Sequence, residues 1–166
     1  MVRLKYIVIA LVVVSVGLVA TLFLFQSEEK KLKKQVRLLS EYVSKDSDES
    51  TIAMARKMQK LGTLFDASCE LKIPVASLTG AYTREEISSY AARGRARFSK
   101  VSLTFFDLDV TFSEGGAAKV NLTARLEGRT NFGEVTRETR ELLCLLRKID
   151  GQWLFNSMEA IEVLRK

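Results

Sequence analysis

The sequence has no histidine, one proline and only two cysteines among its 166 residues. Without histidine the chain cannot form a His-based catalytic triad, a His-liganded zinc site or an imidazole acid or base. Two cysteines are too few for a Cys₄ metal site or a disulfide framework. Nine glycines and one proline exclude a collagen-like repeat and argue against disorder. We therefore expect no metal ion and no cofactor.

Charge is missing from one long run of the chain. Residues 6–25 carry no charged side chain, although the whole sequence has 26 Lys and Arg against 20 Asp and Glu. A helix of this length spans about 30 Å, the thickness of a bilayer's hydrocarbon core. The run is longer than the core of a cleaved signal peptide, and no small-x-small cleavage site follows it. We therefore predict a basic tail at residues 1–5 and an uncleaved transmembrane helix at residues 6–25, with the lipid bilayer as a partner.

Two features of the sequence favour opposite orientations of this helix. A short basic tail with Arg3 and Lys5 is typical of a signal anchor, which exports the rest of the chain. The larger number of Lys and Arg residues just after the helix, at positions 30–37, favours the opposite orientation. We predict a single-pass protein of the inner or plasma membrane with its C-terminal domain periplasmic or otherwise extracytoplasmic, against the Lys/Arg count.

Residues 26–50 form a predicted connector. Its apolar residues recur at spacings of four, three and four, which places one apolar stripe on a helix: Leu32, Val36, Leu39 and Val43. A solvated stalk, a short coiled-coil seam and a basic helix on anionic headgroups all fit this pattern. The polar stretch 44–50 is predicted to be a linker or a helix N-cap.

The remaining residues, 51–166, are predicted to form one domain that begins with helices. Apolar side chains at spacings of three and four predict a helix over residues 51–71: Met54, Met58, Leu61, Phe65 and Cys69. Gly62 lies in this helix, where it permits close packing. Thr83-Arg-Glu-Glu86 is a capping box that opens a second helix to about Lys100, with Tyr90 facing inward and Arg95 on the surface.

Strands follow the helices. Alternating apolar and polar residues predict strands over 106–112, 120–126, 134–149 and 152–164, with a two-residue turn at Asp150-Gly151. Helices followed by a run of antiparallel strands indicate an α+β fold. The turn pairs Ile149 with Gln152 and, counting back, places Leu142 opposite Glu159.

Both faces of this last hairpin are apolar near the turn. The helices can cover only one face, so the other must meet another sheet or another subunit. The sequence therefore predicts a homodimer or a partner in a membrane complex. The candidate dimer face contains Leu143, Leu145, Leu154 and Met158.

The order of elements resembles a known family. A first helix, a helix opening with Thr-Arg-Glu-Glu, and strands ending in Lys-Ile-Asp-Gly-Gln-Trp-Leu-Phe155 are similar to the nuclear transport factor 2-like (SnoaL-like) domains. The resemblance covers residues 51–166 and implies a cone, in which a curved antiparallel sheet wraps helices around a pocket. An anchor before such a domain is similar to assembly proteins of type IV secretion and to membrane proteins of lipid-import systems, by architecture alone.

The same resemblance implies where a pocket would lie. Enzymes of this family place carboxylates, tyrosines and often histidine in the cone. The candidate pocket-lining residues here are Asp66, Tyr90, Glu159, Phe65, Trp153 and Phe155. Each polar member also has an ordinary structural explanation, such as an ion pair between Glu159 and Arg140. We identify no catalytic residues.

The cysteines and the basic excess of the sequence do not point to a further function. Cys69 and Cys144 are either buried thiols or, in an exported domain, a disulfide. The basic excess of residues 51–166 has no nucleic-acid recognition motif beside it, so we expect no nucleic acid. The leading hypothesis is a membrane-anchored, non-enzymatic interaction or assembly module. The alternative is a small-ligand-binding cone with weak lyase or isomerase activity.

Overall fold

The computed structural model describes the backbone of residues 2–161 and the side chains of residues 12–15 and 26–161. The chain divides into two compact units, Met1–Lys34 and Gln35–Lys166, which are described separately. Residues 2–34 of the first unit lie within helix α1, Val2–Val43. The second contains the end of α1 and every other helix and strand that the structure describes.

The predicted transmembrane helix at residues 6–25 is corrected by the structure. This segment is part of the 42-residue helix α1, which continues into a charged stretch with Glu28 and Lys31. No helix among the described residues is both long and apolar enough to cross a membrane. This finding contradicts the predicted membrane span and the predicted membrane localisation. The side chains of residues 6–11 and 16–25 lie outside the described part of the chain.

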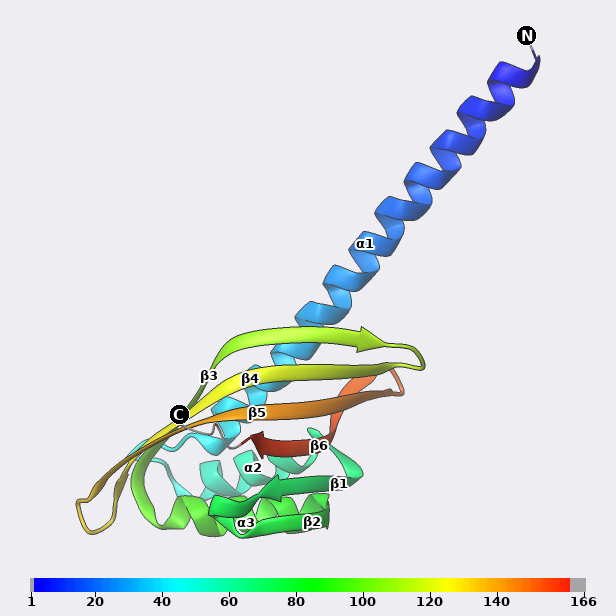
Figure 1. Cartoon of the computed structure of the whole chain (residues 1–166). Coiled ribbons are helices and arrows are strands. Elements are labelled where there is room, and N and C mark those ends of the chain that lie inside the picture. Colours follow the sequence, from blue (N-terminus) through cyan, green and yellow to red (C-terminus); the bar gives the residue numbers. More distant parts are fainter. Residues whose placement is uncertain (1, 162–166) are drawn as a thin grey trace, which may run out of the picture. The chain divides into compact units, whose positions relative to one another are not determined.

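The second unit is an α+β fold built on one six-stranded sheet. Helix α2 (Thr51–Gly62) is followed by β1 (Phe65–Ile73), a short 3₁₀ helix (Pro74–Ala76), β2 (Leu78–Thr83) and helix α3 (Arg84–Ala96). The long strands β3 (Phe98–Ser113), β4 (Ala117–Thr130), β5 (Val135–Ile149) and β6 (Gln152–Ile161) complete it. The strand order is β2-β1-β6-β5-β4-β3, and β3, β4 and β5 bend along their length (Figure 1).

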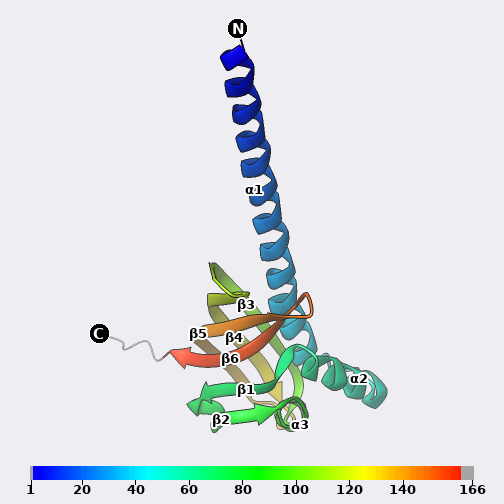
Figure 2. The same ribbon diagram turned by 90° about the vertical axis from the view of Figure 1, so that its right-hand side faces the viewer.

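The sheet is mixed rather than antiparallel throughout. Strand β1 pairs in parallel with β6, and the other neighbouring strands pair antiparallel. Helices α2 and α3 pack on each other, and α3 also contacts β1, β2 and β3. Both helices lie beside the β1–β2 end of the sheet in Figure 2. The fold class predicted from the sequence is thus confirmed at the level of helices on a curved sheet.

The first predicted helix of this domain is shorter than expected. Helix α2 ends at Gly62, and Phe65, Cys69 and Leu71 lie on strand β1 instead. These residues are an even number of positions apart, which fits the two-residue period of a strand as well as a helix. Pairing with β6 and β2 makes the segment a strand. Gly62 does allow close packing, because a Cβ there would lie 2.8 Å from Oγ of Ser88 on α3.

Helix caps are confirmed at both predicted positions. The Thr83 hydroxyl accepts a hydrogen bond from the amide of Glu86, and a carboxylate oxygen of Glu86 accepts one from the amide of Thr83. The Ser50 hydroxyl accepts from the amide of Ala53 and so caps α2. Helix α3 ends at Ala96, earlier than predicted, because Phe98 already pairs with Thr130 in the sheet.

The predicted hairpin turn is confirmed, but its register holds for only part of β6. Asp150 and Gly151 both have positive φ, and Ile149 pairs with Gln152 as expected. Beyond Phe155 a β-bulge inserts Asn156, so Leu145 pairs with Ser157 and Leu143 with Glu159. A bulge shifts every later residue by one position, which moves its side chain to the other face.

The hydrophobic core lies on the face of the sheet that the helices cover. Strands β4 and β5 contribute the alternating buried residues Ala118, Val120, Leu122, Ala124, Leu142, Cys144 and Leu146. Phe65 and Leu71 of β1 and Phe155 and Met158 of β6 continue this buried surface. The apolar residues Val120, Leu122 and Ala124 of the alternation predicted over 120–126 thus lie on the covered face.

Candidate functional site

Three aromatic residues predicted to line a pocket belong to the packed core. Phe65 and Phe155 are buried, and their ring centroids lie 5.5 Å apart. Trp153 is also buried, and its ring lies 5.7 Å from that of Phe112. Aromatic pairs at such distances stabilise a core beyond their buried area. These rings thus connect β1, β6 and β3 through direct packing.

The predicted acid Asp66 lies at the irregular start of β1. Its side chain is half-buried, and one carboxylate oxygen accepts a hydrogen bond of 3.3 Å from the amide of Asn156. The other carboxylate oxygen accepts from the backbone amide of Ala67. Asn156 is the bulged residue of β6, so this bond joins β1 to β6 where their pairing is irregular.

Tyr90 and Glu159 have partners of their own, on other surfaces. Tyr90 is 40% exposed on α3, where it packs edge-on against Tyr82 and lies under the guanidinium of Arg93. Glu159 forms an ion pair with Lys72 of β1 at 4.0 Å. The structure does not bring either residue to Asp66 as part of a shared set of polar contacts among the described residues.

The predicted pairing of Glu159 with Arg140 is wrong. The bulge at Asn156 places Glu159 opposite Leu143, on the face that the helices leave uncovered. Arg140 pairs with Ala124, whose side chain is buried on the covered face, and its guanidinium contacts Glu138. A register shift of one residue is enough to separate the two charges.

The four residues of the candidate dimer face fall into two groups. Leu143 is half-buried and Leu145 is 41% exposed, and both point to the uncovered face. Leu154 belongs to the same face by its register, but its side chain is buried. Met158 pairs with Cys144 and is buried on the covered face, because the bulge reverses its predicted direction.

We define the open face as the surface of β1 and β3–β6 opposite the helices. Its register rows run from Asp109 through Asn121 and Leu143 to Glu159, and from Thr111 through Lys119 and Leu145 to Ser157. Phe106 and Ile161, which are 37% and 40% exposed, belong to a third row. Apolar side chains therefore lie among polar ones across this face.

Charges of both signs surround these apolar residues. The guanidinium of Arg125 lies 4.7 Å from the centre of the Phe106 ring, and Arg137 pairs with Glu127 at 2.7 Å. The basic side chains on the open face include Lys72, Lys119, Arg125, Arg137 and Arg147, and the acidic ones include Glu70, Asp109, Glu127, Glu141 and Glu159. No single sign dominates the open face.

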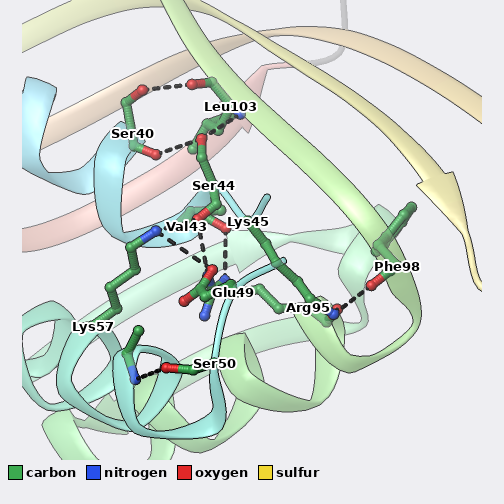
Figure 3. A network of polar contacts seen from close by, with 11 residues as sticks. Ser40, Val43, Ser44, Lys45, Glu49, Ser50, Lys57, Arg95, Phe98 and Leu103 are labelled. Atoms are coloured by element: carbon green, nitrogen blue, oxygen red, sulfur yellow. Dashed lines mark hydrogen bonds and ion pairs between the residues drawn. The ribbon is translucent and has the colours of Figure 1, made fainter. Parts of the chain in front are cut away.

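A buried ion pair lies away from the open face, where the ends of α1 and α3 meet (Figure 3). Arg95 of α3 is 3% exposed, and its Nη2 donates to a Glu49 carboxylate oxygen at 2.6 Å. The same guanidinium donates to the carbonyl oxygens of Val43 and Ser44, each at 2.9 Å. Arg95 thereby caps the C-terminal end of α1 with positive charge.

Two lysines extend this network. Lys57 of α2 donates to the Ser44 carbonyl at 3.2 Å and to the carboxylate of Glu49 at 3.5 Å. Lys45 donates to the Phe98 carbonyl at 2.6 Å and reaches the carbonyl of Arg95 at 3.5 Å. Burial alone would raise the pKa of Glu49, but the hydrogen bond and charge of Arg95, together with Lys57, lower it below its ordinary value of 4.5.

Sequence reasoning placed Arg95 on the helix surface and missed this network. One signal was available: Ile87, Ala91 and Arg95 are spaced by four residues, so Arg95 continues the inward stripe of α3. Glu49 lies in a polar stretch whose composition predicts only a linker. Its partners come from three separate elements, which no local pattern brings together.

The two cysteines are free and buried. Cys69 lies on β1 and Cys144 on β5, and β6 runs between these strands. Two interstrand spacings amount to about 9–10 Å, beyond the roughly 7 Å that a disulfide allows between Cα atoms. Burial is the main cause that raises the pKa of each thiol to about 12. Within the described residues no cluster of acidic or cysteine side chains could hold a metal ion.

Comparisons with known proteins identify the fold. No protein-family model matches the sequence, and no curated protein sequence matches it. A nuclear transport factor 2-like superfamily protein of Salmonella enterica has 16% identity and a TM-score of 0.65, covering 85% of this chain and 94% of its own. The second unit therefore has the nuclear transport factor 2-like cone fold.

Some other structures with this fold are of proteins named as enzymes. A hexachlorocyclohexane dehydrochlorinase is 12% identical with a TM-score of 0.65, and the match covers 82% of this chain and 85% of that one. A protein of Novosphingobium aromaticivorans, proposed as a scytalone dehydratase, is 18% identical with a TM-score of 0.66, covering 84% and 86%. At these identities the likeness is one of fold.

Proposed function

We propose that the second unit is a protein-interaction module in which the open face of one copy packs against the open face of a second copy. The observation that carries this proposal is the exposure of Leu145, Phe106 and Ile161, on β5, β3 and β6, on a sheet face that no helix described in this unit covers. Antiparallel sheets with one free face are ordinarily polar on that face. Large apolar side chains gathered there are typical of an interface.

The charge pattern favours a second copy over an unrelated partner. In a two-fold symmetric interface the same patch meets itself, so a face of one sign would repel its copy. The open face instead mixes Lys119 and Arg125 with Asp109 and Glu141 at neighbouring register positions. Two copies related by a two-fold axis can place these opposite charges against each other.

The area of the open face is also large enough for a protein–protein interface. Four strands about 4.8 Å apart and about ten residues long measure roughly 19 by 33 Å, or about 600 Å² in flat projection. A standard interface takes about 800 Å² of accessible surface from each partner. Because accessible area exceeds flat projection on a side-chain-covered sheet, β3–β6 alone provide an interface of this class.

The molar mass of the full chain, measured by light scattering over a concentration series, tests the proposal. We expect a dimer, and we expect Leu145→Asp to dissociate it because two buried carboxylates would face each other across the interface. Val75→Asp is the matched control, since Val75 is 66% exposed on the 3₁₀ helix and away from the open face. A monomeric wild type, or a Leu145→Asp variant that stays dimeric, contradicts the proposal.

A second candidate function is the binding of a small organic molecule between the helices and the sheet. It is supported by the proteins named as enzymes that share this fold and by the half-buried carboxylate of Asp66 beside Asn156. A thermal-shift screen of small apolar compounds would test it. A stabilising compound should lose its effect in Asp66→Asn and keep it in Asp109→Asn, a carboxylate on the open face. Equal responses of the two variants, or no stabilising compound, argue against this function.

A further inference from the structure

Strand β3 forms one edge of the sheet, and part of that edge is covered by the end of α1. The amide of Val101 donates to the Lys45 carbonyl at 3.0 Å, and the Lys45 amide donates to the Val101 carbonyl at 2.7 Å. The amide of Leu103 donates to the Ser44 hydroxyl at 3.0 Å, and its carbonyl accepts from the Ser40 hydroxyl. Residues 40–45 thus satisfy all four backbone groups that these two residues direct outward.

The covering segment is fixed by the buried ion pair. Arg95 binds the carbonyl oxygens of Val43 and Ser44, which lie within residues 40–45, and Glu49 holds the guanidinium in place. The side chains of Arg95 and Glu49 are 2% and 5% exposed, so both charges are largely removed from water. Backbone cover and ion pair therefore form one continuous structure (Figure 3).

Among the described residues, the cations of this cluster face a single carboxylate. The cations that face Glu49 are Arg95 from α3 and Lys57 from α2, and Lys45 lies nearby on the carbonyls of Phe98 and Arg95. The other acids of the linker, Asp46 and Asp48, are exposed. The C-terminal carbonyls of α1 and α3 accept from the same cations, but only Glu49 carries a full negative charge here.

The network is also incompletely satisfied, which makes it easy to disturb. Among the residues that the structure describes, Oε1 of Glu49 and Nη1 of Arg95 are buried and have no hydrogen-bond partner. A buried polar network with unpaired members is less stable than one in which every group is bonded. Loss of the Glu49 charge would leave the guanidinium buried without a counter-ion, which is strongly unfavourable.

We infer that Glu49 and Arg95 form an acid-sensitive latch that holds residues 40–45 over the edge of β3. With Glu49 ionised, the latch is closed and the backbone groups of Val101 and Leu103 are covered. With Glu49 protonated, the cations lose their counter-charge and the covering segment separates from the strand. An uncovered strand edge presents free N–H and C=O groups, which are the groups that pair with other strands. This device is independent of the open face.

The direction of the pH response follows from the Glu49 carboxyl. Because the folded state lowers its pKa below 4.5, the ionised form stabilises the closed latch above that value. This stabilisation is lost as the pH falls through the lowered pKa.

Amide hydrogen exchange of the full chain, resolved by NMR, tests the latch. After correction for intrinsic rates, the protection factors of Val101 and Leu103 should fall in acid before those of the central strands β4 and β5. In Glu49→Gln they should fall about ten- to a hundredfold already at neutral pH, the loss expected for a hydrogen bond to a charged group. The variant should then show little further change in acid.

Asp48→Asn is the matched control, because it neutralises an exposed acid one residue away. We expect wild-type protection at Val101 and Leu103 in this control. Wild-type protection in Glu49→Gln, or equal losses in both variants, overturns the inference. If Glu49→Gln unfolds the whole unit, the wild-type titration decides: simultaneous loss of protection in β3, β4 and β5 overturns the latch, and earlier loss at the β3 edge supports it.

Discussion

Replacing the buried Arg95 with leucine should destabilise the second unit more than removing any exposed charge of α3. The substitution removes three hydrogen bonds, to Glu49, Val43 and Ser44, and leaves the carboxylate buried with only Lys57 nearby at 3.5 Å. Breaking a buried ion pair by removing one partner costs about 3–5 kcal/mol. The total free energy of unfolding of a domain is about 5–15 kcal/mol, so this loss is a large share of it.

Urea unfolding followed by the fluorescence of Trp153, the single tryptophan and a buried one, measures this loss. Arg93→Leu is the matched control, because Arg93 is exposed two positions away, lies over the face of Tyr90 and donates a long hydrogen bond of 3.4 Å to the Ser89 carbonyl. An exposed cation–π contact contributes about 0.5–1 kcal/mol. At roughly 2–4 °C per kcal/mol, Arg95→Leu should lower Tm by about 6–20 °C. A free energy of unfolding within about 1 kcal/mol of the control value would refute the reasoning.

Three further predictions concern stability and reactivity. The free energy of unfolding should fall as the pH drops below 4.5 towards the lowered pKa of Glu49, because the unfolded chain takes up a proton on this carboxylate at a higher pH than the folded one does. Glu49→Gln should flatten this part of a urea-unfolding pH series, and an unchanged slope contradicts the role of Glu49. Cys69 and Cys144 should resist a thiol reagent at pH 8 in the native state, because the pKa values of both thiols are about 12. Both should react in denaturant without reductant, and rapid labelling of either in the native state would contradict their burial. Gly62→Ala should lower Tm because its Cβ would meet Ser88, whereas Gly94→Ala, with open space around it, should raise stability by up to about 1 kcal/mol; a reversed order would show that α2 and α3 do not approach closely at Gly62.

The sequence predicts the local features of this fold better than the long-range ones. The Thr83 capping box, the Ser50 cap and the Asp150–Gly151 turn depend on residues within four positions of each other, and all three are confirmed. The resemblance carried by these motifs identifies the cone fold correctly. Helix caps and tight turns depend on neighbouring residues and do not need tertiary context.

The errors arise where distant segments decide the structure. Phe65 and Cys69 satisfy a helical spacing, but pairing with β6 and β2 makes them part of a strand. The bulge at Asn156 has no signature in the alternating pattern, and it alone reverses Met158 and separates Glu159 from Arg140. The bulge changed the predicted site, because the faces of a sheet are exchanged by a shift of one residue.

The predicted membrane span failed for a different reason. The pattern predicts residues 6–25 as a separate element, whereas the structure places them in one continuous helix from Val2 to Val43, and no helix among the described residues is long and apolar enough to cross a membrane. The buried ion pair was missed because Glu49, Lys57 and Arg95 lie on three elements whose meeting point depends on the whole fold. Composition alone classifies each of these residues as a surface charge.

The contact between two open faces is tested most directly by a distance between copies. A spin label at Asn121→Cys, near the centre of the open face, should give an intermolecular distance below about 35 Å in double electron–electron resonance, because no two points near the centres of packed faces this size lie farther apart. The native thiols are buried and should not take the label. A label at Val75→Cys on the 3₁₀ helix should give a longer distance. No intermolecular signal from position 121, or a distance no shorter than that from position 75, would contradict the proposed face-to-face dimer.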